Sequence, residues 1–99
     1  MSAQMEKAKD GAPSREEIEA KFEEEELSPQ SWSNAPGDRY GWHSHSYRKV
    51  LYCVSGSIVF HIEDEDFEME AGDRLDVEPE TEHAATVGPD GVQCMEAAR

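Results

Sequence analysis

Three histidines of this chain, His43, His45 and His83, have the type and spacing that suit metal binding. His43 and His45 are separated by one residue, so on an extended strand both imidazoles project from the same face, with Cα atoms about 6.6 Å apart. Two such rings need a third donor, and His83 follows a turn-rich acidic stretch that can bring it near. Because an isolated pair of this kind also occurs among surface histidines, the surrounding sequence decides between the two interpretations. The remaining histidine, His61, alternates with apolar residues and is expected on the surface.

Two stretches around these histidines resemble the two characteristic motifs of the cupin family, from about residue 27 to residue 97. The second is the run GDRLDVEPETEH, which ends at His83. The first consists of spaced glycine, histidine and lysine positions: Gly37, His43, His45, Lys49 and Gly56. The resemblance implies an all-β fold, a small double-stranded β-helix of the jelly-roll type, whose mouth holds a divalent metal ion. His43, His45 and His83 would be its ligands, and such a donor set suits Zn, Fe, Mn or Ni.

Lys49 departs from the family pattern, because this position usually holds a glutamate that completes the ligand set. Strand alternation places Lys49, Tyr47 and Cys53 on the same face as the histidines, so these three are candidate contacts of a bound ligand. Three roles for Lys49 remain open. It could hold an anionic substrate or a nearby acid beside a three-histidine metal site. It could mark a pocket that binds ligand without metal, or it could turn outward and cover the rim.

The second motif is also altered, since Pro79 falls one residue late, Glu80 replaces a glycine and Val87 an asparagine. These changes allow the loop before His83 to follow a different path. Three acids in and beside that loop could supply the missing carboxylate, although solvated surface acids are the simpler interpretation: Glu78, Glu80 and Glu82.

The elements that must position these residues are one helix followed by short strands. Residues 1–13 lack the apolar content to offset the entropy of ordering them and are expected to form a loose tail. Ser14 and Glu17 form a capping box, which predicts a helix over residues 15–25, and Pro29 prevents its continuation. We therefore divide the chain into an acidic N-terminal tail and helix, 1–27, and a cupin barrel, 28–99. Turn residues separate the strands expected at 30–33, 40–43, 47–54, 57–62, 67–70, 74–77, 83–87 and 92–96.

The composition is strongly acidic, with 23 Asp and Glu against 9 Lys and Arg and a formal net charge of −14. This balance argues against binding nucleic acid or an anionic membrane. Acids spread along the chain are typical of halophilic proteins, in which salt screens the repulsion. No signal peptide or long apolar run is evident, so a cytoplasmic location is expected. Cys53 and Cys94 lack metal or redox spacing and are expected to be buried thiols.

The resemblance leaves two classes of function open, both with a small, anionic organic molecule as the partner. The first is a metal-dependent protein, such as a dioxygenase or an isomerase. The second is a non-enzymatic metabolite-binding or sensor module, with or without metal, because the fold does not determine the reaction. No general acid or base can be recognised, so the sequence does not decide whether the chain is an enzyme. A chain of 99 residues buries little surface, which favours a homodimer.

Overall fold

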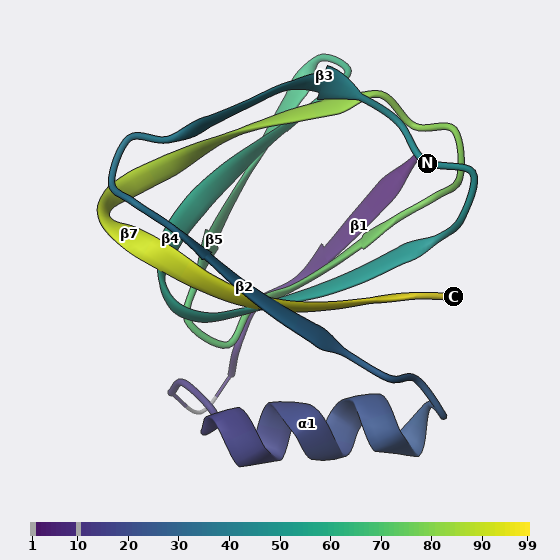
Figure 1. The fold of residues 1–99 in the computed structure, drawn as a ribbon, viewed down its shortest axis with the longest axis vertical. Helices are drawn as coiled ribbons and strands as arrows, with labels where there is room; N and C mark the ends of the chain where they lie inside the picture. Colours follow the sequence, from purple (N-terminus) through teal and green to yellow (C-terminus); the bar gives the residue numbers. More distant parts are fainter. Residues whose placement is uncertain (1, 10) are drawn as a thin grey trace.

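The computed structural model describes residues 2–9 and 11–99 and is almost entirely built of β-strands, as the sequence predicts. The strands curl around an enclosed space, and the single helix of the described residues lies across the outside (Figure 1). The elements in chain order are β1 (Ala3–Glu6), α1 (Arg15–Glu24), β2 (Gln30–Asn34), β3 (Arg39–His43), β4 (Lys49–Ile62), β5 (Glu65–Glu70), β6 (Arg74–Val77) and β7 (His83–Ala98). No helix among these is long and apolar enough to cross a membrane.

Two long strands, β4 and β7, pair antiparallel along most of their length and form the spine of the barrel. The first half of β4 also pairs with β6 and its second half with β5. Similarly, β7 pairs with β3 near its start and with β2 near its end. Each long strand therefore pairs with two short strands in addition to its long partner. The β3–β7 pairing brings together residues near 40 and residues near 85 of the chain.

The sequence predicts two short strands where each long one is found, because its turn residues mark bends and not ends. The β4–β7 register shifts on both sides of Ser55 and Gly56. Gly56 has a φ of 77°, and a Cβ there would lie 2.0 Å from the carbonyl oxygen of Gly91. Glycine therefore permits both the left-handed backbone and the close approach of the two bends.

The expectation of a loose N-terminal tail is wrong for residues 3–6, which form β1 and pair antiparallel with β6. Asp73 fixes this segment, because its carboxylate accepts hydrogen bonds from Lys7 Nζ at 2.6 Å and from the Ala8 amide at 2.8 Å. Backbone pairing and these charge-assisted bonds offset the ordering entropy that the composition alone leaves uncompensated. Residues ahead of the helix thus belong to the same sheet as the barrel strands.

The helix α1 has the predicted capping box and covers the outer face of β4 and β7. Ser14 Oγ accepts from the Glu17 amide, and the Glu17 carboxylate accepts from the Ser14 amide. Ile18 and Phe22 are buried against a patch formed by outward-facing strand residues, Val50, Tyr52, Met95 and Ala97. The first part of β4 is therefore covered on both faces, which explains why its sequence is apolar at successive positions from Val50 to Val54.

Candidate metal centre

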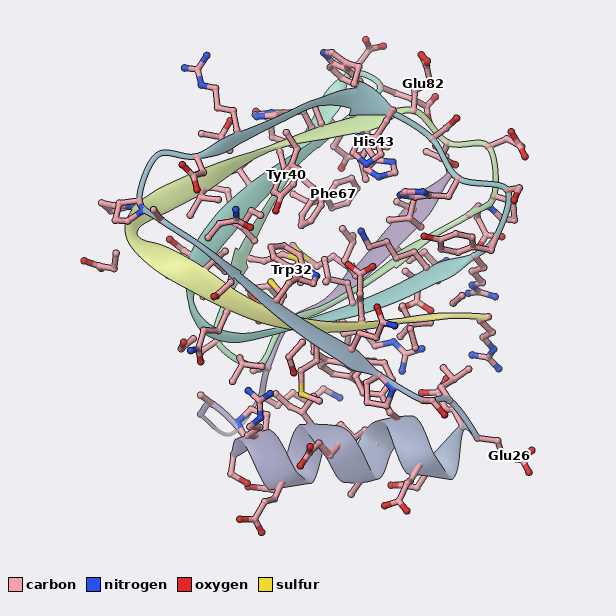
Figure 2. All side chains as sticks on the ribbon, in the orientation of Figure 1. Glu26, Trp32, Tyr40, His43, Phe67 and Glu82 are labelled. Atoms are coloured by element: carbon pink, nitrogen blue, oxygen red, sulfur yellow. The ribbon has the colours of Figure 1, made fainter. Side chains whose placement is uncertain are left out.

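The fold brings His43, His45 and His83 together at one end of the space enclosed by the strands. His43 ends β3 and is directly opposite His83, the first residue of β7, while His45 follows in the connection to β4. Ring centroids are 4.3 Å apart for His43 and His83, 5.0 Å for His43 and His45, and 5.1 Å for His45 and His83. One nitrogen from each ring lies within 4.8 Å of the other two. Figure 2 shows the His43 side chain directed into the barrel.

Hydrogen bonds at the far side of two rings orient them toward a common centre. Nδ1 of His43 is 2.7 Å from the Gly41 carbonyl oxygen, and Nδ1 of His83 is 2.8 Å from that of Thr81. A carbonyl oxygen only accepts, so Nδ1 carries the proton in both rings and Nε2 keeps its lone pair. This is the tautomer that a metal ligand needs.

Two of the Nε2 atoms are buried without a hydrogen-bond partner among the described residues, those of His45 and His83. A buried polar atom that has no partner costs about 1–3 kcal/mol, so such atoms call for an explanation. A divalent ion at the centre of the three rings would satisfy both lone pairs, so the donor set fits a metal.

The surroundings favour the neutral form, which ligates metals, for His45 and His83. Burial lowers the pKa of His83, opposed by the Thr81 carbonyl and assisted by His43 and Lys49. Burial likewise lowers the pKa of His45, with a further contribution from Lys49. Three imidazoles with open coordination positions suit a divalent transition metal ion.

The Lys49 side chain points inward and is 10% exposed, so it does not turn outward over the rim. Its Nζ is 3.0 Å from Glu96 Oε1, and the same oxygen accepts from Trp32 Nε1 at 2.6 Å. The sequence analysis did not predict Glu96 as a residue of this site. Alternation along β7 could have identified it, because positions 92, 94 and 96 share a face and the first two are apolar and buried.

A cavity of about 150 Å³ opens beside the histidines. Its lining combines aromatic, apolar and polar side chains: Trp32, Tyr40, His43, His45, Lys49, Phe60 and Ala85. Of the other candidate ligand contacts, Tyr47 stacks on the His45 ring with centroids 4.9 Å apart and is exposed. Cys53 is fully buried in the core and is not part of this lining.

The residues outside the cluster take other positions. His61 lies on the outer face of β4, where its ring nitrogens are 2.7 Å from Asp66 Oδ1 and 3.0 Å from Thr86 Oγ1. Glu82 points away from the barrel (Figure 2). Glu80 has a φ of 64° and its amide donates to the His45 carbonyl at 2.7 Å. The loop thus keeps a left-handed backbone, of the kind that favours glycine, where glutamate has replaced it.

The comparisons with known proteins agree with this architecture. The model of the cupin domain family matches residues 31–93. An RmlC-like cupin from Shewanella frigidimarina shares the fold, with 24% identity, a TM-score of 0.65, and coverage of 73% of this chain and 64% of that chain. A cupin superfamily protein from Desulfitobacterium hafniense matches over 97% of this chain and 75% of its own, with 13% identity and a TM-score of 0.66.

One more similar structure comes from work on the DMSP lyases RdDddP and RnDddQII. It has 28% identity and a TM-score of 0.63 and covers 74% of this chain but 37% of that one. This chain therefore spans less than two thirds of the length of that structure and of the Shewanella protein. The curated proteins contain no match. Since the family model covers most of the chain and the strands, barrel and histidine cluster agree with it, this chain belongs to the cupin family.

Proposed function

We propose that this chain binds one divalent transition metal ion through His43, His45 and His83. The observation that carries the proposal is the pair of buried Nε2 atoms of His45 and His83, which have no protein partner among the described residues. The Nδ1 hydrogen bonds of His43 and His83 and the lowered pKa values of His45 and His83 support it, because they favour neutral rings whose Nε2 lone pairs are free.

The ligand that we propose for the cavity beside the metal is a small organic anion. A cavity of about 150 Å³ accommodates a molecule the size of benzene, which limits the ligand to a few non-hydrogen atoms. Lys49 reaches this cavity, and an ammonium group has three donors. Glu96 engages one of them, so a carboxylate of the ligand can accept from another.

His43, His45 and His83 would hold the ion, and a metal ion there would supply a Lewis acid for an oxygen of the bound ligand, which suits isomerase or dioxygenase chemistry. A panel of small carboxylates therefore tests for turnover by this chain. DMSP belongs in that panel because a similar structure comes from work on DMSP lyases. The second candidate is a metal-free metabolite-binding module, which Lys49 favours because it stands where the family usually places a ligating glutamate.

Metal analysis of protein purified without a histidine tag separates the two candidates. We expect one ion per chain in the wild type. We expect affinity to fall by at least about 100-fold in His43→Ala and His83→Ala, because each removes a ligand and not merely a supporting group. His61→Ala is the matched control and should bind normally, since His61 lies on the outer face. Chelation should also lower the Tm of the wild type, because an ion bound only to the folded state stabilises it.

Two results would contradict the metal proposal. The first is a wild type that takes up no transition metal after reconstitution and whose Tm is insensitive to chelator. The second is equal metal uptake by His83→Ala and the wild type. Retention of small carboxylates by such metal-free protein would favour the metabolite-binding module.

A further inference from the structure

We propose that Cys53 and Cys94 form an oxidative modification site, at which a disulfide bond links β4 to β7 beneath the ligand cavity. The two residues are far apart in the sequence but directly opposite in the β4–β7 ladder. Both are free thiols and both are fully buried, so neither serves as an exposed reactive group. They are also the only cysteines of the chain, which leaves each a single intramolecular partner.

The position of the pair in the ladder brings the side chains close. Arg48 and Arg99 exchange both backbone hydrogen bonds, at 3.3 and 2.7 Å. Antiparallel pairs alternate between hydrogen-bonded and non-hydrogen-bonded, and the register runs without a shift from this pair to Cys53 and Cys94. By that alternation the two cysteines occupy a non-hydrogen-bonded position.

The backbone of Cys53 independently supports this assignment. Its amide donates to the Asp73 carbonyl at 3.0 Å and its carbonyl accepts from the Gly72 amide at 2.8 Å, so both groups face the segment that leads into β6 and not β7. Opposite Cα atoms at a non-hydrogen-bonded position are about 4.5 Å apart. This separation lies within the range of about 4.4–6.8 Å over which disulfides form.

The two thiols differ in reactivity. Interaction with the Cys94 thiol lowers the pKa of Cys53, while the same interaction and burial raise the pKa of Cys94. Because the thiolate is the nucleophile, Cys53 is the residue that reacts first.

Hydrogen peroxide is a sufficient oxidant for the proposed step. The Cys53 thiolate attacks one peroxide oxygen, the O–O bond breaks, and the products are a sulfenic acid and a hydroxide that takes up a proton. The Cys94 sulfur then attacks the Cys53 sulfur, the S–S bond forms, and the departing hydroxide leaves as water with the Cys94 proton. In total the two thiols lose two electrons and two protons, and peroxide becomes two molecules of water.

The bulge in β4 provides the route by which peroxide reaches the buried pair. Cys53 Sγ is 3.5 Å from the carbonyl oxygen of Ser55 and 3.7 Å from that of Gly56. Both of these residues are exposed, and the β4–β7 register shifts there. Local opening of this short segment exposes Cys53 without global unfolding, so oxidation should be slower than that of an exposed thiol but should occur in the folded protein.

The bond would connect to the cavity through β2. Cys94 is directly opposite Trp32 in the β2–β7 ladder, and the Trp32 ring lines the cavity and donates to Glu96. Oxidation would therefore link β4 to β7 next to Trp32, whose indole N–H donates to Glu96, the ion-pair partner of Lys49.

The test is incubation of native protein with millimolar peroxide, followed by alkylation of remaining thiols and peptide mapping. Trypsin cleaves after Lys49 and Arg74, which places Cys53 in peptide 50–74 and Cys94 in peptide 75–99. We expect these peptides to be joined in monomeric protein, with a mass about 2 Da below their sum, and to separate on reduction. The cross-link closes a long loop, so the Tm should rise by about 10 °C.

Cys94→Ala is the matched control, because it keeps Cys53 and cannot form the bond; its Tm should not rise on oxidation. The mapping of wild-type protein decides the outcome even if this variant fails to fold. Recovery of both alkylated cysteines after prolonged incubation would overturn the proposal. So would sulfinic acid at Cys53, or a cross-link found only between two chains.

Discussion

At the residue scale, the Lys49 and Glu96 pair is the feature that distinguishes this site from the family pattern. The side chains of Lys49 and Glu96 are 10% and 25% exposed, and a charge in such surroundings is stable only with a partner. Trp32 Nε1 donates to the same Glu96 oxygen and so orients the carboxylate. Glu96 therefore balances the charge that Lys49 brings to the cavity and lies outside the cluster of His43, His45 and His83.

Breaking this pair should be more damaging than removing it. We expect Lys49→Met to lower the free energy of unfolding by about 2 kcal/mol, because the partly buried Glu96 loses its counter-charge and keeps only the Trp32 donor. Glu96→Gln should lower the free energy of unfolding by a similar amount, because Lys49 then loses its counter-charge. The double variant should lose less than the sum of the two, as urea denaturation can measure. Strictly additive losses would show that the two side chains do not interact.

At the scale of elements, Asp73 holds β1 and the segment that follows it against the barrel. Its carboxylate is 2% exposed and accepts from Lys7 Nζ, the Ala8 amide and the Glu70 amide. Burial alone would raise the pKa of Asp73, but the hydrogen bonds from Lys7, Glu70 and Ala8 outweigh it, so the pKa is lowered. One charged group thereby anchors an edge strand that has only four residues.

This anchor should depend on pH in a defined direction. Because the folded pKa of Asp73 is below its unfolded value of about 3.9, its contribution is fully present above that value and is lost as pH falls through the folded pKa. We expect Asp73→Asn to lower the free energy of unfolding by about 2 kcal/mol at neutral pH. The difference from wild type should shrink toward pH 3, as urea denaturation at both pH values can show.

Glu70→Gln is the control for this comparison, since it removes a charge that is 4.0 Å from the same Lys7 Nζ but belongs to a largely exposed side chain. It should change stability little. Equal losses from Glu70→Gln and Asp73→Asn, or a loss in Asp73→Asn that does not change with pH, would refute the anchoring role.

At the scale of the whole molecule, the excess of acid dominates the electrostatics. A formal charge of −14 is carried by a chain whose Cα radius of gyration is 12.5 Å, so like charges are close together. Several basic residues are already engaged in ion pairs, for example Arg74 and Arg99 with Glu25. The remaining repulsion opposes folding unless salt screens it.

Stability should therefore rise between 0.1 and 2 M KCl, because the screening length falls from about 10 Å to below about 3 Å. Circular dichroism during thermal unfolding measures the effect, and sedimentation of the same samples tests for the expected homodimer. Changing the exposed Glu16, Glu19 and Glu23 to Lys alters the formal charge by six, from −14 to −8. This variant should depend less on salt. Equal stability of the wild type at both concentrations would exclude a halophilic adaptation.

The sequence by itself determined the features that depend on neighbouring residues. The capping box placed the start of the helix at Arg15, as the structure confirms. The spacing of His43 and His45 predicted that both rings can reach one centre, and the two rings do lie together, although His45 is in the connection after β3 and not on a strand. Alternation within β4 placed Lys49 on the same inward face as Cys53. Helix capping and strand alternation are predictable because both are set by local backbone geometry.

Only the tertiary structure decided which distant residues meet. The pairing of β3 with β7 sets His83 against His43, and the register of β7 places Glu96 beside Lys49 and Cys94 opposite Cys53. The same is true of β1, whose pairing with β6 composition did not predict. Register depends on how the long strands bend at Gly56 and Gly91, and a shift by one residue would turn each of these side chains to the other face.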